Sequence, residues 1–189
     1  ENKNLIPDFK YDNYIISVLS CVRYHNIINI LKAFKLFKDK TKSKTKLTFI
    51  MQILDKDYFK EIEKFIINND LKNEIIFFHN LNNIYLANLY KKASLYIFSS
   101  YCEVFGLTSL EAMSQGCPVL ISNRSALPEI NGQAAHYFNP DDYQEIYESV
   151  LTIFENNDYK NKLISNGNSH VKKFDWNKTV RETLNVLYS

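Results

Sequence analysis

The sequence predicts a doubly wound α/β domain, in which a parallel sheet is covered by helices on both faces. Two observations predict this class. Short apolar runs rich in β-branched residues alternate with segments whose apolar residues recur at helical spacing. Hydrophobic residues make up 46% of the 189 residues, which is enough for a packed core. Because parallel strands need helical crossovers, this alternation places helices on both faces of the sheet. We expect one domain over residues 1–189, Rossmann-like in fold, whose last part, residues 142–189, is helical.

The apolar runs predict the strands in chain order. They cover residues 14–19, 47–51, 74–78, 95–98 and 119–121, with a short strand at 136–138. Apolar residues at helical spacing predict helices over residues 27–40 and 58–69, a short one around 86–90, and another over 107–115. Gly116 is suited to end this last helix in the left-handed conformation. Asp175 is suited to cap a final helix that carries Trp176, Val180, Leu184 and Leu187.

Composition excludes several classes of function. The formal net charge of +2 lacks the basic excess of a nucleic-acid-binding domain, so no nucleic acid partner is expected. The four glycines are too far apart for a G-x-G-x-x-G or P-loop motif. The three cysteines lack C-x-x-C spacing and indicate reduced thiols of a cytoplasmic protein. Residues 1–4 do not form a signal peptide, and no apolar run is long enough to span a bilayer. Since the chain does not begin with Met, we expect it to be part of a longer protein.

Residues 99–116 carry the most chemistry. Glu103 and Glu111 bracket Gly106 at the start of a predicted helix. A glycine there lets a ligand approach the backbone, and the free N–H groups of a first helical turn favour an anion such as a diphosphate. Glu111, one turn into the helix, would accept hydrogen bonds from a ribose, and Glu103 would face the group at the far end of the diphosphate. We expect both to border a common pocket. The alternative is that both glutamates are simply solvated.

The same segment resembles the signature of a known family, the GT-B retaining glycosyltransferases of family 4, or glycosyl transferases group 1. The resemblance is carried by Glu103-x7-Glu111 with Phe105-Gly106-Leu107 between the two acids. It continues through residues 116–119, 127–130, 132–135, 138–140 and 174–176 in the order typical of the family. It spans essentially the whole chain. It implies the C-terminal, nucleotide-sugar-binding half of such an enzyme, with the N-terminal acceptor domain absent from these residues.

The resemblance also implies roles for single residues. Glu111 would hold the donor ribose, Glu103 would hold hydroxyls of the donor sugar, and the loop containing Leu81 would border the nucleotide base. Backbone amides of three consecutive residues would contact the sugar or the diphosphate: Phe105, Gly106 and Leu107. No metal ion and no cofactor is implied, because the nucleotide-diphosphate sugar is itself the donor substrate.

The segment after the first strand departs from the family pattern. The family usually has Gly-Arg there and a Lys a few residues later, which together clamp the diphosphate. In this chain Ser20 occupies the arginine position and His25 the lysine position. Arg23 would supply a displaced positive charge to the phosphate oxygens, and His25 a pH-dependent one. We therefore predict Arg23 and Glu103 as catalytic residues and His25 as a donor-binding residue. The alternative is that Arg23 and His25 only border the helix that follows.

Two further patterns have alternative interpretations. Asp55-Lys56-Asp57 has the D-x-D spacing of a metal site, but it precedes a predicted helix and is better suited to cap it. The lysines between residues 32 and 46 are typical of a solvated face near a helix end. They would alternatively contact an anionic membrane surface, which suits a protein that is peripheral to a membrane.

We therefore expect a metal-independent, retaining glycosyltransferase of hexosyltransferase type. It would transfer a sugar from a nucleotide-diphosphate sugar to a glycan, lipid-linked or protein acceptor, with the isolated domain weakly active or inactive. Leaving-group charge on the diphosphate would be stabilised by helix amides and Arg23. Two alternatives remain: a catalytically degenerate module that binds a nucleotide sugar or another domain, and an epimerase or phosphorylase of the same fold.

Overall fold

The computed structural model describes residues 13–188. Residues 1–4, on which the expectation about a signal peptide rests, lie outside the described residues. The strands of the structure are β1 (Tyr14–Cys21), β2 (Lys46–Ile53), β3 (Ile75–Phe78), β4 (Leu95–Phe98), β5 (Val119–Ser122) and β6 (His136–Phe138). They form one six-stranded sheet in the order β3-β2-β1-β4-β5-β6, and every pairing is parallel. This confirms the predicted doubly wound, Rossmann-like sheet.

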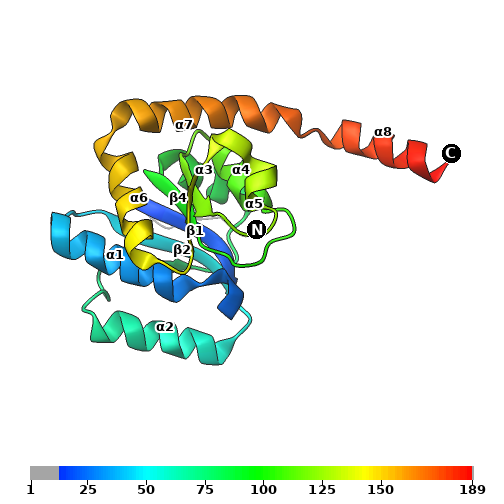
Figure 1. Cartoon of the computed structure of the whole chain (residues 1–189). Helices are drawn as coiled ribbons and strands as arrows, with labels where there is room; N and C mark the ends of the chain where they lie inside the picture. Colours follow the sequence, from blue (N-terminus) through cyan, green and yellow to red (C-terminus); the bar gives the residue numbers. More distant parts are fainter. Residues whose placement is uncertain (1–12, 189) are drawn as a thin grey trace, which may run out of the picture.

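Helices cover both faces of this sheet (Figure 1). The α-helices are α1 (Ile27–Thr41), α2 (Lys56–Asn68), α3 (Asn83–Lys92), α4 (Leu107–Ser114), α5 (Leu127–Asn131), α6 (Tyr143–Glu155), α7 (Asn157–His170) and α8 (Trp176–Leu187). On one face α1 packs against α2 and α6, and on the other α4 packs against α3 and α7. The predicted helices are all present, with bounds that differ by a few residues. The short helix α5 is an addition that the sequence analysis did not predict.

The strand order reverses between β1 and β4, which are neighbours in the centre of the sheet. In β1 Ile15 pairs with Leu47 of β2 on one side and with Leu95 of β4 on the other. The residues of β4 and β5 are buried throughout, as expected for strands covered on both faces. Because the connections that leave β1 and β4 run to opposite faces, a crevice opens beyond their carboxyl ends.

Capping residues set several helix ends as predicted. The Asp55 carboxylate accepts hydrogen bonds from the backbone N–H groups of Asp57 and Tyr58 and so caps α2. This confirms the capping interpretation of the D-x-D string. Asp175 caps α8 by accepting from the N–H of Asn177. Gly116 follows α4 in the left-handed region with φ of 74°.

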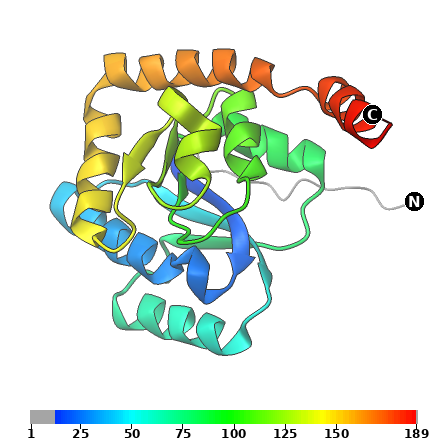
Figure 2. The ribbon, with the colours of Figure 1, turned by 45° about the vertical axis from the view of Figure 1, so that its right-hand side comes forward.

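Helix α8 differs from the others because none of its residues is buried. It extends beyond the body of the domain after α7 (Figures 1 and 2). Its apolar residues are exposed, Trp176 by 75% and Leu187 by 71%. Within residues 13–188 no helix has the length and apolar character needed to cross a membrane.

Candidate functional site

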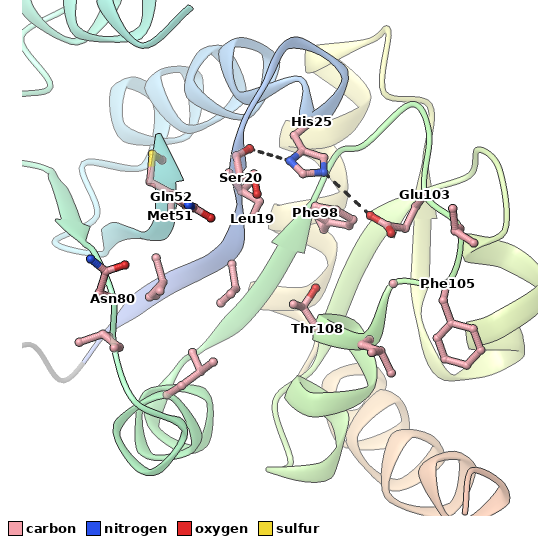
Figure 3. A pocket seen from close by; sticks show the side chains of 17 residues that line it. Leu19, Ser20, His25, Met51, Gln52, Asn80, Phe98, Glu103, Phe105 and Thr108 are labelled. Atoms are coloured by element: carbon pink, nitrogen blue, oxygen red, sulfur yellow. Dashed lines mark hydrogen bonds and ion pairs between the residues drawn. The ribbon is translucent and has the colours of Figure 1, made fainter. Parts of the chain in front are cut away.

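A cavity of about 520 Å³ lies in the crevice beyond β1 and β4, the place that the topology indicates (Figure 3). Its walls come from the carboxyl ends of β1, β2 and β4, the loops that follow β1, β3 and β4, helix α3 and the start of α4. The polar side chains in these walls are Ser20, His25, Gln52, Asn80, Glu103 and Thr108. No lysine or arginine is among the described residues that line it.

Gly106 shapes the wall formed by the loop after β4. It precedes α4 as the N-cap residue, in the left-handed region with φ of 82°. A Cβ atom at this position would lie 2.7 Å from Cδ2 of Leu127, so the conformation favours glycine and any side chain here would displace the end of the buried Leu127. The Ser109 hydroxyl lies 2.7 Å from the Gly106 carbonyl and holds the turn in place. Since Gly106, Leu107 and Thr108 all border the cavity, the positive end of the α4 dipole faces it.

His25 and Glu103 meet across the cavity from opposite loops (Figure 3). Nδ1 of His25 lies 2.6 Å from the carbonyl oxygen of Ser20, and Nε2 lies 3.9 Å from Oε2 of Glu103. A carbonyl only accepts, so Nδ1 carries the hydrogen, and Nε2 of the neutral ring is a bare acceptor on the cavity side. Burial lowers the pKa of His25, opposed by its bond to the Ser20 carbonyl and by the Glu103 carboxylate.

Serine hydroxyls join the loops after β1 and β4. The buried Ser99 hydroxyl lies 3.1 Å from the carbonyl oxygen of His25 and 2.9 Å from that of Asn26. The backbone N–H of Tyr101 donates to the carbonyl of Tyr24 at 2.8 Å. These bonds fix the backbone around His25 against the loop that carries Glu103. The sequence analysis missed the role of Ser99, although a polar residue directly after a buried strand was a usable signal.

The structure does not bring Arg23 into the cavity. Its guanidinium makes two hydrogen bonds to the Glu61 carboxylate, of 2.6 and 3.1 Å, and lies 3.7 Å from Asp55. It also lies over the Tyr58 ring, with Cζ 5.2 Å from the ring centroid. The predicted displaced phosphate ligand is therefore held on the outer side of its loop by α2. The cause is tertiary, because Glu61 lies far from Arg23 in the sequence.

Glu111 does not border the same cavity as Glu103, in contrast to the expected common pocket. It lines an adjacent hollow of about 160 Å³ between α3 and α4, and Leu86 borders both spaces. The Tyr90 hydroxyl donates to Oε2 of Glu111 at 3.3 Å. Burial raises the pKa of Glu111, and the hydrogen bond from Tyr90 opposes this shift. The two acids therefore occupy neighbouring hollows rather than one pocket.

The remaining predicted residues lie in the cavity wall: Leu81, Phe105 and Leu107. Phe105 also contacts Phe174, with ring centroids 5.9 Å apart, in the segment that leads into α8. Gln52 and Asn80 were not predicted as site residues. Gln52 is a polar residue within the strand β2, and Asn80 adopts the left-handed conformation with φ of 55°. A polar residue at the carboxyl end of a parallel strand was the available signal for Gln52.

With this geometry established, the chain can be compared with known proteins. The family described as glycosyl transferases group 1 matches residues 2–170. The chain belongs to this family, and its fold is that of the GT-B glycosyltransferases. It is therefore a glycosyltransferase family member with the predicted signature in place.

Curated relatives include bacterial enzymes. The chain is 27% identical over 165 residues to the O-antigen chain mannosyltransferase RfbU of Salmonella typhimurium, which covers 87% of this chain and 44% of that protein. It is 34% identical over 101 residues to the O-antigen chain mannosyltransferase B of Escherichia coli, covering 53% of this chain and 26% of that protein. The chain thus spans less than half the length of these relatives.

Solved structures share the fold. One is the C-terminal domain of a glycosyl transferase group 1 family protein, LpcC, from Francisella tularensis. It aligns with a TM-score of 0.73 and 23% identity and covers 85% of each chain. Another is HepE from Anabaena, in complex with UDP and glucose. It aligns with a TM-score of 0.84 and 19% identity over 94% of this chain and 49% of that one.

Proposed function

We propose that this chain is the donor-binding domain of a retaining glycosyltransferase, which transfers a sugar from a nucleotide-diphosphate sugar to an acceptor. The observation that carries the proposal is the cavity beyond β1 and β4, where Glu103, Gly106 and the start of α4 lie together in a member of this family. HepE, which shares the fold, has been solved with UDP and glucose. RfbU and its Escherichia coli counterpart are mannosyltransferases, so a hexose, and mannose first, is the proposed sugar.

In this proposal each wall of the cavity holds one part of the donor. The backbone N–H groups at Gly106 and Leu107, with the α4 dipole, bind the diphosphate. Glu103 accepts hydrogen bonds from sugar hydroxyls. Glu111 accepts them from the ribose, which would extend past Leu86 into the adjacent hollow. The base then lies toward the loop that contains Leu81. Catalysis rests on stabilising the charge that develops on the leaving diphosphate and on positioning, without a metal ion.

The acceptor and part of the catalytic apparatus are proposed to belong to a separate N-terminal domain, because the chain spans 44% of RfbU. The acceptor is a glycan, a lipid-linked sugar or a protein. We accordingly expect residues 1–189 alone to bind the donor weakly and to turn over little. Robust transfer by these residues alone would contradict this part of the proposal.

Location at a membrane surface in the cytoplasm is a further part of the proposal. Three of the lysines around α1 are in ion pairs: Lys35 with Asp39, and Lys38 and Lys46 with Glu74. The exposed lysines Lys40, Lys42 and Lys44 would contact anionic lipid. Co-sedimentation with vesicles that contain anionic lipid, compared with neutral vesicles, tests this contact.

The decisive experiment is release of nucleoside diphosphate from a nucleotide sugar by the whole protein. Glu103→Ala should lower this release at least about a hundredfold, as when a group acting on the reacting centre is lost. Glu63→Ala removes an exposed glutamate of α2 and is the matched control, for which unchanged release is expected. Equal rates for the two variants would contradict the role of Glu103.

One observation favours a second candidate, a degenerate module that binds a nucleotide sugar without catalysis. Arg23 is held outside the cavity by Glu61, and no lysine or arginine lines the cavity among the described residues. A thermal-shift panel of nucleotide sugars distinguishes the two, because a ligand that binds the folded state raises its apparent stability. A shift without any release of nucleoside diphosphate by the whole protein would support the degenerate module.

A further inference from the structure

The charges around the candidate cavity do not match a diphosphate. The described residues that line it include one carboxylate, Glu103, and no lysine or arginine. Arg23, two positions before His25, is turned outward to Glu61. A nucleotide-diphosphate sugar would add two negative charges to a site that already holds one. The backbone N–H groups of α4 offer partial charges only. A group in the cavity that supplies a full positive charge would therefore strengthen donor binding.

His25 has the geometry to supply that charge. The Ser20 carbonyl fixes Nδ1 as a donor, which leaves Nε2 facing the cavity as the atom that can gain a proton. Groups from several elements face the His25 ring. They are the Ser20 carbonyl of β1, the Phe98 ring of β4, the neighbouring Tyr24 ring and the Glu103 carboxylate. Of these, Glu103 is the charged group, and it favours the protonated ring.

We propose that His25 takes up a proton when a nucleotide sugar binds, so that donor affinity in this protein is coupled to pH through this residue. The inference rests on the proposed function. The proton comes from solvent and binds at Nε2. The resulting imidazolium then donates to a phosphate oxygen of the donor while Glu103 remains close by.

The pKa of His25 differs between the free protein and the donor complex, and the groups around the ring determine the direction of this difference. In the free protein burial keeps the ring neutral, because it lowers the pKa of His25 below its ordinary value. A nearby dianion favours the charged ring and raises that pKa. At a pH between the pKa of His25 in the free protein and its pKa in the complex, binding takes up as much as one proton. Affinity should therefore fall as pH rises, by up to about tenfold per pH unit.

The test uses UDP-glucose and GDP-mannose as probes, because the diphosphate of a nucleotide sugar is esterified at both ends and does not titrate near neutral pH. Isothermal titration calorimetry is run at several pH values between 6 and 9, each in two buffers of different ionisation enthalpy. The difference in measured enthalpy gives the number of protons taken up. We expect the number of protons taken up to lie between zero and one and to reach its maximum between pH 6 and 9. We also expect affinity to fall as pH rises over this range.

Variants assign the proton to one residue. His25→Asn keeps a donor for the Ser20 carbonyl and removes the nitrogen on the cavity side, so binding should weaken and lose its proton uptake. His25→Lys should bind with little proton uptake because its charge is permanent. His170→Gln is the matched control. Nε2 of His170 likewise lies within hydrogen-bond distance of a backbone carbonyl oxygen, 2.7 Å from the oxygen of Ile130, but His170 does not line the cavity. This variant should retain the uptake of the native protein.

A second measurement does not depend on the folding of any variant. Long-range proton–nitrogen NMR spectra of the native chain report the tautomer and the pKa of the His25 ring with and without the nucleotide sugar. The inference requires a hydrogen on Nδ1 in the free protein and a higher pKa in the complex. Binding of either probe with an unchanged His25 pKa, or with uptake retained in His25→Asn, overturns the inference alone. Failure of both probes to bind overturns the proposed function with it.

Discussion

The loops after β1 and β4 face each other across one cavity, but they line it in different ways. The loop after β4 presents its backbone to the cavity: Gly106 is in the left-handed region, and the first turn of α4 opens onto the cavity. The loop after β1 carries two side chains whose direction depends on the partner that each one meets, and for Arg23 this partner is distant in the sequence. Glu61 turns Arg23 outward, and the Ser20 carbonyl turns His25 inward. The comparison teaches that a glycine-dependent backbone turn can be predicted from a local pattern, whereas the direction of a side chain that pairs with a distant residue, as Arg23 does with Glu61, cannot.

The largest expected effect comes from breaking the backbone-built loop with Gly106→Ala. The left-handed conformation costs about 1 kcal/mol for alanine. The 2.7 Å approach to Leu127 adds about 1–3 kcal/mol of overpacking. Chemical denaturation should therefore show a loss of about 2–4 kcal/mol, with weakened binding of a nucleotide sugar.

Gly116→Ala is the control for this variant. Gly116 also has a positive φ, of 74°, but a Cβ there would lie 4.0 Å from Cγ2 of Ile164, an ordinary contact. Its cost should stay near about 1 kcal/mol, and binding should not change. If both variants cost the same, the close approach of Leu127 to Gly106 has no energetic role.

Ser99→Ala tests whether the two loops depend on each other. It removes the buried hydroxyl shared by the carbonyls of His25 and Asn26, which should cost about 1–2 kcal/mol. Because His25 loses this anchor, nucleotide-sugar binding should weaken as well. Thr152→Ala is the control, since its exposed hydroxyl bonds the Glu148 carbonyl within α6, away from both hollows, and a change within about 0.5 kcal/mol is expected. Thermal unfolding and calorimetry measure both; native-like binding by Ser99→Ala would show that the loops are independent.

The smallest effect is expected from Arg23→Gln, on the outer side of the loop after β1. The ion pair with Glu61 is exposed, and such pairs contribute little to stability. The midpoint of thermal unfolding should stay within about 2 °C. Nucleotide-sugar affinity should change by less than about threefold. A loss of tenfold or more would show that Arg23 leaves Glu61 to bind the diphosphate, as the sequence analysis predicted.

Most of the fold could be predicted because it depends on local patterns. The β-branched runs, the Asp55 and Asp175 caps and the left-handed Gly116 each leave a signal within a few residues. The short helix α5 was missed because five residues offer little periodicity. The family signature around Glu103 and Gly106 was equally local, and the family match confirms it.

The unpredicted part of the site depends on contacts between distant residues. Arg23 meets Glu61 of α2, and the Ser99 hydroxyl meets the carbonyls of His25 and Asn26. The expected common pocket for Glu103 and Glu111 divides into two hollows that share the side chain of Leu86. Each of these features is decided by how elements pack, which spacing along the chain does not encode.

The most direct test of the central claim is a crystal structure of this chain with GDP-mannose or UDP-glucose. The account predicts that the donor occupies the cavity beyond β1 and β4. Its diphosphate would lie within hydrogen-bond distance of the Gly106 and Leu107 amides and of His25 Nε2, and its sugar would lie beside Glu103. A donor bound elsewhere on the domain, with this cavity empty, would contradict it.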